Sequence, residues 1–246
     1  MNNRAFQILV ALVISTSSFG QSYLRDSIIS ITSFQFGYTP SLTAFDMGDK
    51  SDFLHIFSPS ISHKNKSNWY FKGSIGLIVG HNALERETPN MVFSELELPI
   101  SADGLLQEMA IRFQGFCFGL EIGKLIKVSD HNLNSGIYLA AGVGFLQHRI
   151  KFDYLGQGVL QLEEPYIFGY DRLTNGTLIN QFIGWRRYSN RNSFNYEFGI
   201  ELNQGLTRNR RSWNYDLFGP DNNLRLDFYY GLRMNVILPF YGVSAR

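Results

Sequence analysis

The residues best suited to catalysis are the five histidines, His55, His63, His81, His131 and His148. Acyl-transfer chemistry needs a hydroxyl, a histidine and a carboxylate within hydrogen-bonding reach of one another. Ser74 and His81 share one candidate strand, but at the usual strand rise they lie about 23 Å apart, too far for proton transfer. No nucleophile-elbow, phosphate-loop or Cys/His metal motif is present. The sequence therefore predicts no enzyme, cofactor or metal site, although a catalytic set assembled across strands stays open as an alternative.

Charged side chains also recur at alternate positions within otherwise apolar segments. In residues 194–203, Glu197 and Glu201 share one face, while the aromatic and aliphatic residues share the other. Because side chains alternate across a β-strand, charges at this spacing gather on one side of a sheet. Both signs occur, so we expect the charges to pair with one another in a buried interior. The predicted charge network comprises Lys72, Glu121, Arg186, Glu197, Glu201, Asp227 and Arg233.

The segments that carry these charges are typical of β-strands. Apolar residues alternate with small or polar ones in each segment, and a helical period is almost absent. Such a strand is half-buried, with one apolar face and one polar or glycine-rich face. The eight predicted strands are 28–39, 53–63, 69–82, 109–127, 136–149, 178–188, 194–203 and 226–240.

The connections between these strands alternate in length. The short ones, 64–68, 128–135 and 189–193, are rich in the Asn, Asp and Ser of tight turns. The long ones are 40–52, 83–108, 150–177 and 205–225. All long connections would then emerge at one end of an up-and-down sheet. Compact soluble domains avoid long irregular loops, whereas outer-membrane barrels have short turns at one end and long loops at the other.

Composition agrees with such a barrel. Only 17% of the residues are charged and 15% are aromatic, and the mean hydropathy of −0.11 argues against a helical membrane protein. A sheet in hydrocarbon must close on itself to satisfy its backbone. The predicted fold is therefore an all-β, eight-stranded antiparallel up-and-down transmembrane barrel, apolar outside and charged inside. The net charge of +1 predicts no nucleic-acid partner.

The N-terminus predicts export. Arg4 precedes an apolar stretch, and small residues follow up to Gly20, as in a secretory signal peptide. We expect residues 1–20 to be the signal peptide and residues 21–246 to be one barrel domain. Cys117 is the only cysteine, so no internal disulfide can form. Cys117 is expected to pack inside the barrel.

The long loops differ in charge. Residues 83–107 are acidic, with five carboxylates against Arg86, but they lack the spacing of a calcium loop. Residues 205–223 carry Arg208, Arg210 and Arg211 next to aromatic residues. These arginines could pair with lipopolysaccharide phosphates, because guanidinium groups bind phosphate in a bidentate manner. The alternative is an ordinary solvated loop.

The whole predicted barrel resembles the small eight-stranded outer-membrane β-barrel family, similar to the outer-membrane protein A and X barrels. The last strand is similar to the family's loose assembly signal, with Gly231, Met234, Val236 and a late aromatic, Phe240. It departs from that pattern at Pro239 and in the extension 241–246. The resemblance implies a cell outer membrane location in a Gram-negative envelope and a monomer. It also implies contact with outer-membrane lipids, lipopolysaccharide, periplasmic chaperones and the barrel-assembly machinery.

Three functions are compatible with this fold. The main hypothesis is a non-enzymatic, porin-like barrel with an envelope, surface-interaction or narrow-transport role. The alternatives are a lipid A deacylase-like barrel enzyme and a PorT-type barrel subunit of a secretion apparatus. Aromatic residues near both ends of the strands predict two girdles at the membrane boundaries. One girdle would include Trp69, Tyr138, Tyr188, Phe194, Tyr196, Phe240 and Tyr241, and the other Tyr38, Phe53, Phe145, Phe182 and Phe228.

Overall fold

The computed structural model describes residues 28–80, 99–130, 132–154, 158–189, 194–215 and 217–241, without the side chains of Gln161 and Tyr241. Several predictions fall outside these residues. They are the signal peptide (1–20), most of the acidic segment 83–107, His81, His131 and the extension 242–246.

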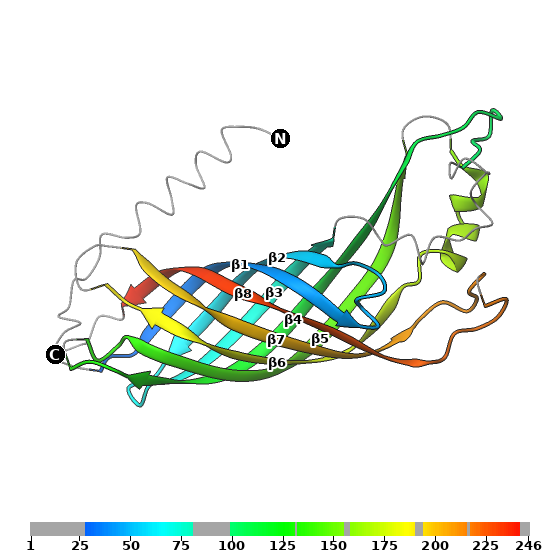
Figure 1. Ribbon diagram of the computed structural model, residues 1–246. Helices are drawn as coiled ribbons and strands as arrows, with labels where there is room; N and C mark the ends of the chain where they lie inside the picture. Colours follow the sequence, from blue (N-terminus) through cyan, green and yellow to red (C-terminus); the bar gives the residue numbers. More distant parts are fainter. Residues whose placement is uncertain are drawn as a thin grey trace.

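Eight antiparallel strands form one closed ring in sequence order, with β8 paired to β1 (Figure 1). The prediction of an eight-stranded up-and-down barrel is confirmed. The strands are β1 (Ile31–Phe45), β2 (Phe53–Lys64), β3 (Trp69–Gly80), β4 (Met109–Lys127), β5 (Gly136–Tyr154), β6 (Thr174–Arg187), β7 (Asn195–Asn209) and β8 (Leu224–Tyr241).

The alternating pattern places all eight strands, but several run further toward the loops than predicted: β5 ends at Tyr154, β6 begins at Thr174 and β7 ends at Asn209. The predicted connections 150–177 and 205–225 are therefore too long, since residues 155–173 and 210–223 link these strands. β4 has the predicted bounds, whereas β1 continues through Pro40 to Phe45. The prediction of a long 40–52 connection is therefore wrong, and only 46–52 link β1 to β2. Proline lacks the N–H that a ladder needs. The β1–β2 pairing includes Pro40, whereas the β1–β8 pairing skips Thr39 and Pro40.

The two ends of the barrel differ. We call the end with the short connections the turn end and the opposite one the loop end. At the loop end the β4–β5 hairpin extends beyond the other strands (Figure 1). Two short 3-10 helices, η3 (Leu160–Leu162) and η4 (Tyr166–Gly169), pack near it. Ile150, Val159 and Tyr170 belong to a small hydrophobic core there, separate from the lumen.

Apolar side chains cover the outer wall, as the alternation predicts. Phe118, Leu120 and Val143 are each at least half exposed, although a water-soluble protein would bury such residues. The inward positions instead carry buried polar and charged groups. Among the described residues, no helix is long and apolar enough to cross a membrane.

Candidate functional site

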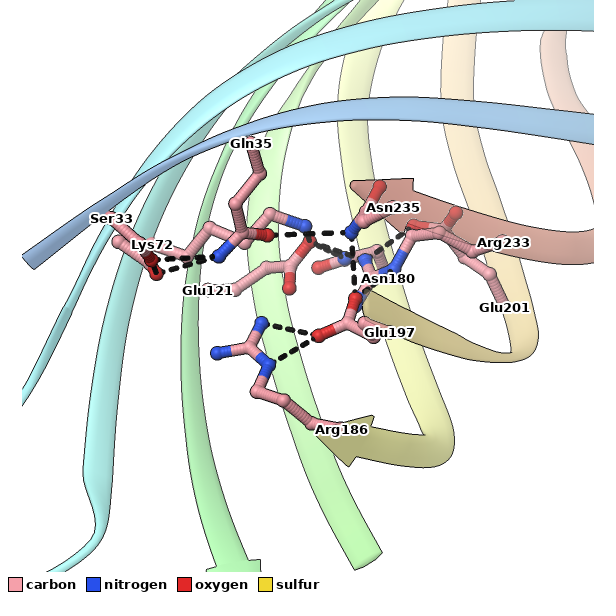
Figure 2. Close-up of polar contacts among 11 residues, drawn as sticks. Ser33, Gln35, Lys72, Glu121, Asn180, Arg186, Glu197, Glu201, Arg233 and Asn235 are labelled. Carbon is pink, nitrogen blue, oxygen red and sulfur yellow. Dashed lines mark hydrogen bonds and ion pairs between the residues drawn. The ribbon is translucent and has the colours of Figure 1, made fainter. Parts of the chain in front are cut away.

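A layer of paired charges crosses the lumen (Figure 2). Arg233 of β8 is its centre and reaches three glutamates on β4 and β7. Its Nη1 lies 2.8 Å from Glu121 Oε1 and 3.1 Å from Glu201 Oε1, and its Nε lies 3.2 Å from Glu197 Oε1. Lys72 of β3 completes this group, with Nζ 3.4 Å from Glu121 Oε1. All these side chains are nearly or fully buried.

Arg186 of β6 extends the layer toward the turn end. Its Nε donates to Glu197 Oε2 at 2.6 Å, and its Nη2 pairs with the same oxygen. The guanidinium lies between two aromatic rings, 4.3 Å from the centroid of Tyr70 and 4.1 Å from that of Tyr138. Cation–π contact adds to the ion pair in such a desolvated setting. The lumen is therefore filled at this level by arginine and tyrosine.

Six of the seven predicted network residues are thus brought together: three cations and three carboxylates. The amides of Asn180 and Asn235 donate to Glu121 and Glu197, at 2.9 and 2.7 Å. These two asparagines were not among the predicted network residues, although both occupy inward positions. Burial removes charges from water, and this cost is offset only when the charges pair closely and accept further hydrogen bonds. The paired charges and the two amide donors meet this condition.

Little empty space remains beside these charges. A cavity of about 40 Å³ lies next to Lys72, Glu121 and Arg233. Glu121 Oε2 has no hydrogen-bond partner among the described residues. A space of this size holds only a few water molecules. The charged layer therefore closes the lumen rather than lining a pore.

Asp227, the seventh predicted residue, lies apart from this network. Its Oδ2 accepts hydrogen bonds from His148 Nε2 at 2.7 Å and Thr207 Oγ1 at 2.5 Å. Lys50 Nζ, from the β1–β2 loop, lies 3.4 Å from Oδ1. Burial lowers the pKa of Lys50, and the charge of Asp227 opposes that shift. Asp227 thereby holds the first loop in the barrel mouth, a contact that no local sequence pattern indicates.

Buried apolar side chains pack beside the Asp227 cluster at the mouth. Met47 from the same loop packs with Leu54, Phe113 and Leu146. These residues are fully buried. The mouth at the loop end is thus closed by a loop side chain on top of an apolar plug.

The described histidines do not form a nucleophile–histidine–carboxylate chain. His148 and Thr207 both bond to the same oxygen of Asp227, which is not the order that such a chain requires. His55 Nδ1 lies 2.8 Å from Tyr38 Oη on the outer wall. His63 contacts Ser30 and Thr32 near the turn end. Within the same described part, no cluster of His, Cys, Asp or Glu could hold a metal ion.

The three loop arginines have different surroundings. Arg211 makes its contacts within the chain, because it pairs with Asp171 and stacks on Phe168. Arg210 is exposed and donates from Nε to Asn175 Oδ1 at 2.6 Å. Arg208, at the end of β7, is exposed and faces outward. Arg211 is therefore already paired within the chain, while the contact of these arginines with lipopolysaccharide phosphates stays a prediction.

The residues of the predicted assembly signal all lie in β8, at its pairing with β1 or near its end. Met234, Val236 and Phe240 face outward. Gly231 faces inward, where an added Cβ would lie 2.2 Å from the carbonyl oxygen of Pro40. This close approach gives Gly231 a packing role in the barrel itself.

The predicted aromatic girdles need correction at three positions. Tyr138, Tyr188 and Phe182 are buried in the lumen near the turn end. The ring of Tyr138 occupies the space above Gly123, where an added Cβ would lie 2.4 Å from it. Trp69 does lie on the outer wall, with Lys124 Nζ 4.8 Å from its ring centroid. Gly123 is an inward glycine diagonal to Tyr138 across the β4–β5 pair, and it leaves the space that this ring fills.

No protein-family model matches the sequence, and no curated protein matches it. Solved structures do show similarity. Ail, the attachment invasion locus protein of Yersinia pestis, aligns with a TM-score of 0.47 and 11% identity, covering 85% of this chain and 99% of Ail. Its complex with the heparin analogue sucrose octasulfate gives a TM-score of 0.45, with the same identity and coverage. The N-terminal β-barrel domain of Pseudomonas aeruginosa OprF gives 0.38 at 11% identity, covering 84% and 97%.

These similarities are too distant to transfer a function. The assignment of the fold rests on the chain's own strand ring, the apolar outer wall and the charged interior. The chain has the fold of the small eight-stranded outer-membrane β-barrels.

Proposed function

We propose that the chain is an integral outer-membrane barrel of a Gram-negative envelope, and that it acts through its outer wall and loops rather than through its lumen. The observation that carries this proposal is the reversal of polarity. Phenylalanine, leucine and isoleucine are exposed outside, while six charges pair inside. Hydrocarbon is the solvent that suits such an outer wall.

Fractionation tests the location. We expect the protein in the outer-membrane fraction, with a gel mobility that shifts on boiling because the folded barrel resists detergent. Recovery from the soluble periplasm, with no such shift, would contradict the proposal.

The closed lumen disfavours the transport role. Arg186 between Tyr70 and Tyr138 fills the barrel toward the turn end, and Met47 fills the mouth at the loop end. In planar bilayers we expect no steady conductance from the purified protein. Sustained open-channel currents under these conditions would instead support the narrow-transport hypothesis.

Exposed apolar residues on the loops favour a surface-interaction role. Trp213 is 46% exposed and Phe218 is 65% exposed, and Tyr166 and Phe168 of η4 are also exposed. Large exposed apolar side chains above a membrane commonly contact other macromolecules. On intact cells, a variant that combines Trp213→Ser and Phe218→Ser should lose the protein crosslinks that the wild-type loops form, while the barrel stays heat-modifiable. Identical crosslinks in the variant would count against these loops.

Recovery of a secretion complex with the wild type would select the PorT-type alternative.

A further inference from the structure

At the loop end of the described outer wall, lysine and arginine lie only on the β4–β7 side. Outward positions near that end of β4, β5 and β7 carry Arg112, Arg149, Lys151 and Arg208, and Arg210 follows directly after β7. The outward positions of β8, β1, β2 and β3 carry no lysine or arginine. At the corresponding height β8 instead presents Leu224 and Leu226. The basic patch is therefore a local feature of the β4–β7 wall.

Strand register places these cations next to one another. Gln147 of β5 pairs with Asn175 of β6, which pairs with Arg208 of β7. Arg210 N donates to Leu173 O, so Arg210 lies two residues beyond Arg208 toward the loops. Neighbouring strands are about 4.8 Å apart, so the backbones of Arg149 and Arg210, two strands away, are about 10 Å apart.

A chain of polar contacts runs through the middle of the patch. Asn175 Nδ2 donates to Gln147 Oε1 at 3.2 Å, and Arg210 Nε donates to Asn175 Oδ1 at 2.6 Å. These contacts orient Arg210 along the wall and leave its terminal Nη donors for another acceptor. The outer wall thus changes here from apolar to hydrogen-bonding.

The patch has too few carboxylates to neutralise it. Asp153 lies between Arg112 and Lys151, at 3.5 and 2.7 Å. Arg149 and Arg208 have no ion-pair partner in the described part of the chain, and nearby Asp171 is already paired with Arg211. At the described outward positions of this patch, five cations therefore accompany one carboxylate, Asp153.

We propose that Arg149, Arg208 and Arg210 bind a phosphate group carried by a glycolipid of the outer leaflet, with Arg112 and Lys151 at its edge. This inference rests on the proposed membrane location. The side chains project sideways from the wall, just beyond the apolar band that ends on β5 at Phe145, so their ligand lies beside the barrel. Arginine forks suit phosphate oxygens, and partial desolvation at the lipid boundary strengthens charge-assisted hydrogen bonds.

Binding of phosphorylated lipopolysaccharide to the full barrel in nanodiscs tests the site. The matched ligand is the same lipopolysaccharide after enzymatic removal of its lipid A phosphates. The test variant combines Arg149→Gln, Arg208→Gln and Arg210→Gln. The control variant combines Lys124→Gln and Arg187→Gln, which remove outward cations at the turn end.

We expect the wild type and the control variant to bind the phosphorylated lipid at least about tenfold more tightly than the dephosphorylated one, since charge-assisted bonds carry the contact. The triple variant should lose that preference and remain heat-modifiable. Equal binding of both lipids by the wild type, an unchanged preference in the triple variant, or full displacement by millimolar inorganic phosphate would overturn the proposal. A chain that does not insert at all would instead refute the membrane location.

Discussion

Charged residues occur in two regions of this barrel, and the two regions treat them in opposite ways. In the charged layer of the lumen, three cations meet three carboxylates, and each of these six charges has at least one partner within 3.4 Å. On the described part of the β4–β7 wall, five outward cations accompany one carboxylate, Asp153, which pairs with only Arg112 and Lys151. Charges enclosed by protein must be neutralised within the chain, whereas charges at the surface can be neutralised by something else. The lumen is therefore a structural element, and the outer patch is a candidate binding site.

The largest effect should come from the centre of the lumen. Arg233→Ala would leave Glu121, Glu197 and Glu201 without their shared cation, so we expect a loss of about 3–5 kcal/mol in the free energy of unfolding. Urea unfolding in lipid vesicles, followed by tryptophan fluorescence, measures it. A loss below about 1 kcal/mol would show that the lumen charges are individually dispensable, as those of a solvated surface are.

The second-largest effect on the free energy of unfolding should come from packing next to the charged layer. Gly123→Ala would place a methyl group 2.4 Å from the Tyr138 ring, and such overpacking should cost about 1–3 kcal/mol. Gly73→Ala is the matched control on the outer wall, because its added Cβ would lie 3.6 Å from Leu120 Cδ2, an ordinary contact. The same urea titration distinguishes them. Equal stability of the two variants would contradict the tight interior described here.

A substitution at the barrel mouth should cost less stability than the two substitutions above. In Lys50→Met, Asp227 keeps its bonds from His148 and Thr207, so we expect a loss of about 1 kcal/mol. Faster protease cleavage within residues 46–52 should accompany it, because the loop loses its anchor in the lumen. Unchanged cleavage would mean that Met47 alone holds the loop.

The smallest effect on stability should come from the outer patch. Arg149→Gln removes a cation with no partner among the described residues, so unfolding in vesicles without lipopolysaccharide should change by less than about 0.5 kcal/mol. Adding lipopolysaccharide should stabilise the wild type more than this variant, because a bound ligand stabilises the folded state. A large loss without any lipopolysaccharide would place Arg149 among the structural charges instead.

Much of the barrel could be predicted from local pattern. Period-two alternation gave β4 its bounds and placed Glu121, Glu197 and Arg233 on inward faces, because the pleat alone decides the face. Partners across the lumen depend on the stagger of the strands, which no single strand encodes. Asp227 consequently has Lys50 and His148 as partners, which the sequence did not indicate.

The arginines of the last loop show the same limit. Arg208, Arg210 and Arg211 are close in sequence, yet only the first two face outward. Arg211 turns toward Asp171, which lies 40 residues away and is brought near by the packing of two loops. Composition could suggest a phosphate-binding group but could not separate the internal cation from the external ones.

Two of the three strand prolines, Pro40 and Pro59, have a consequence for how the wall could open. The β1–β2 pairing is continuous past Pro40 and Pro59, whereas the β1–β8 pairing skips Pro40 and the β2–β3 pairing skips Pro59. The β1–β2 hairpin is thus joined internally without a break and is bordered on each side by an interrupted ladder. A sideways separation of the wall would cost the fewest backbone hydrogen bonds along these two borders, so amide hydrogen exchange should be faster there than within the hairpin.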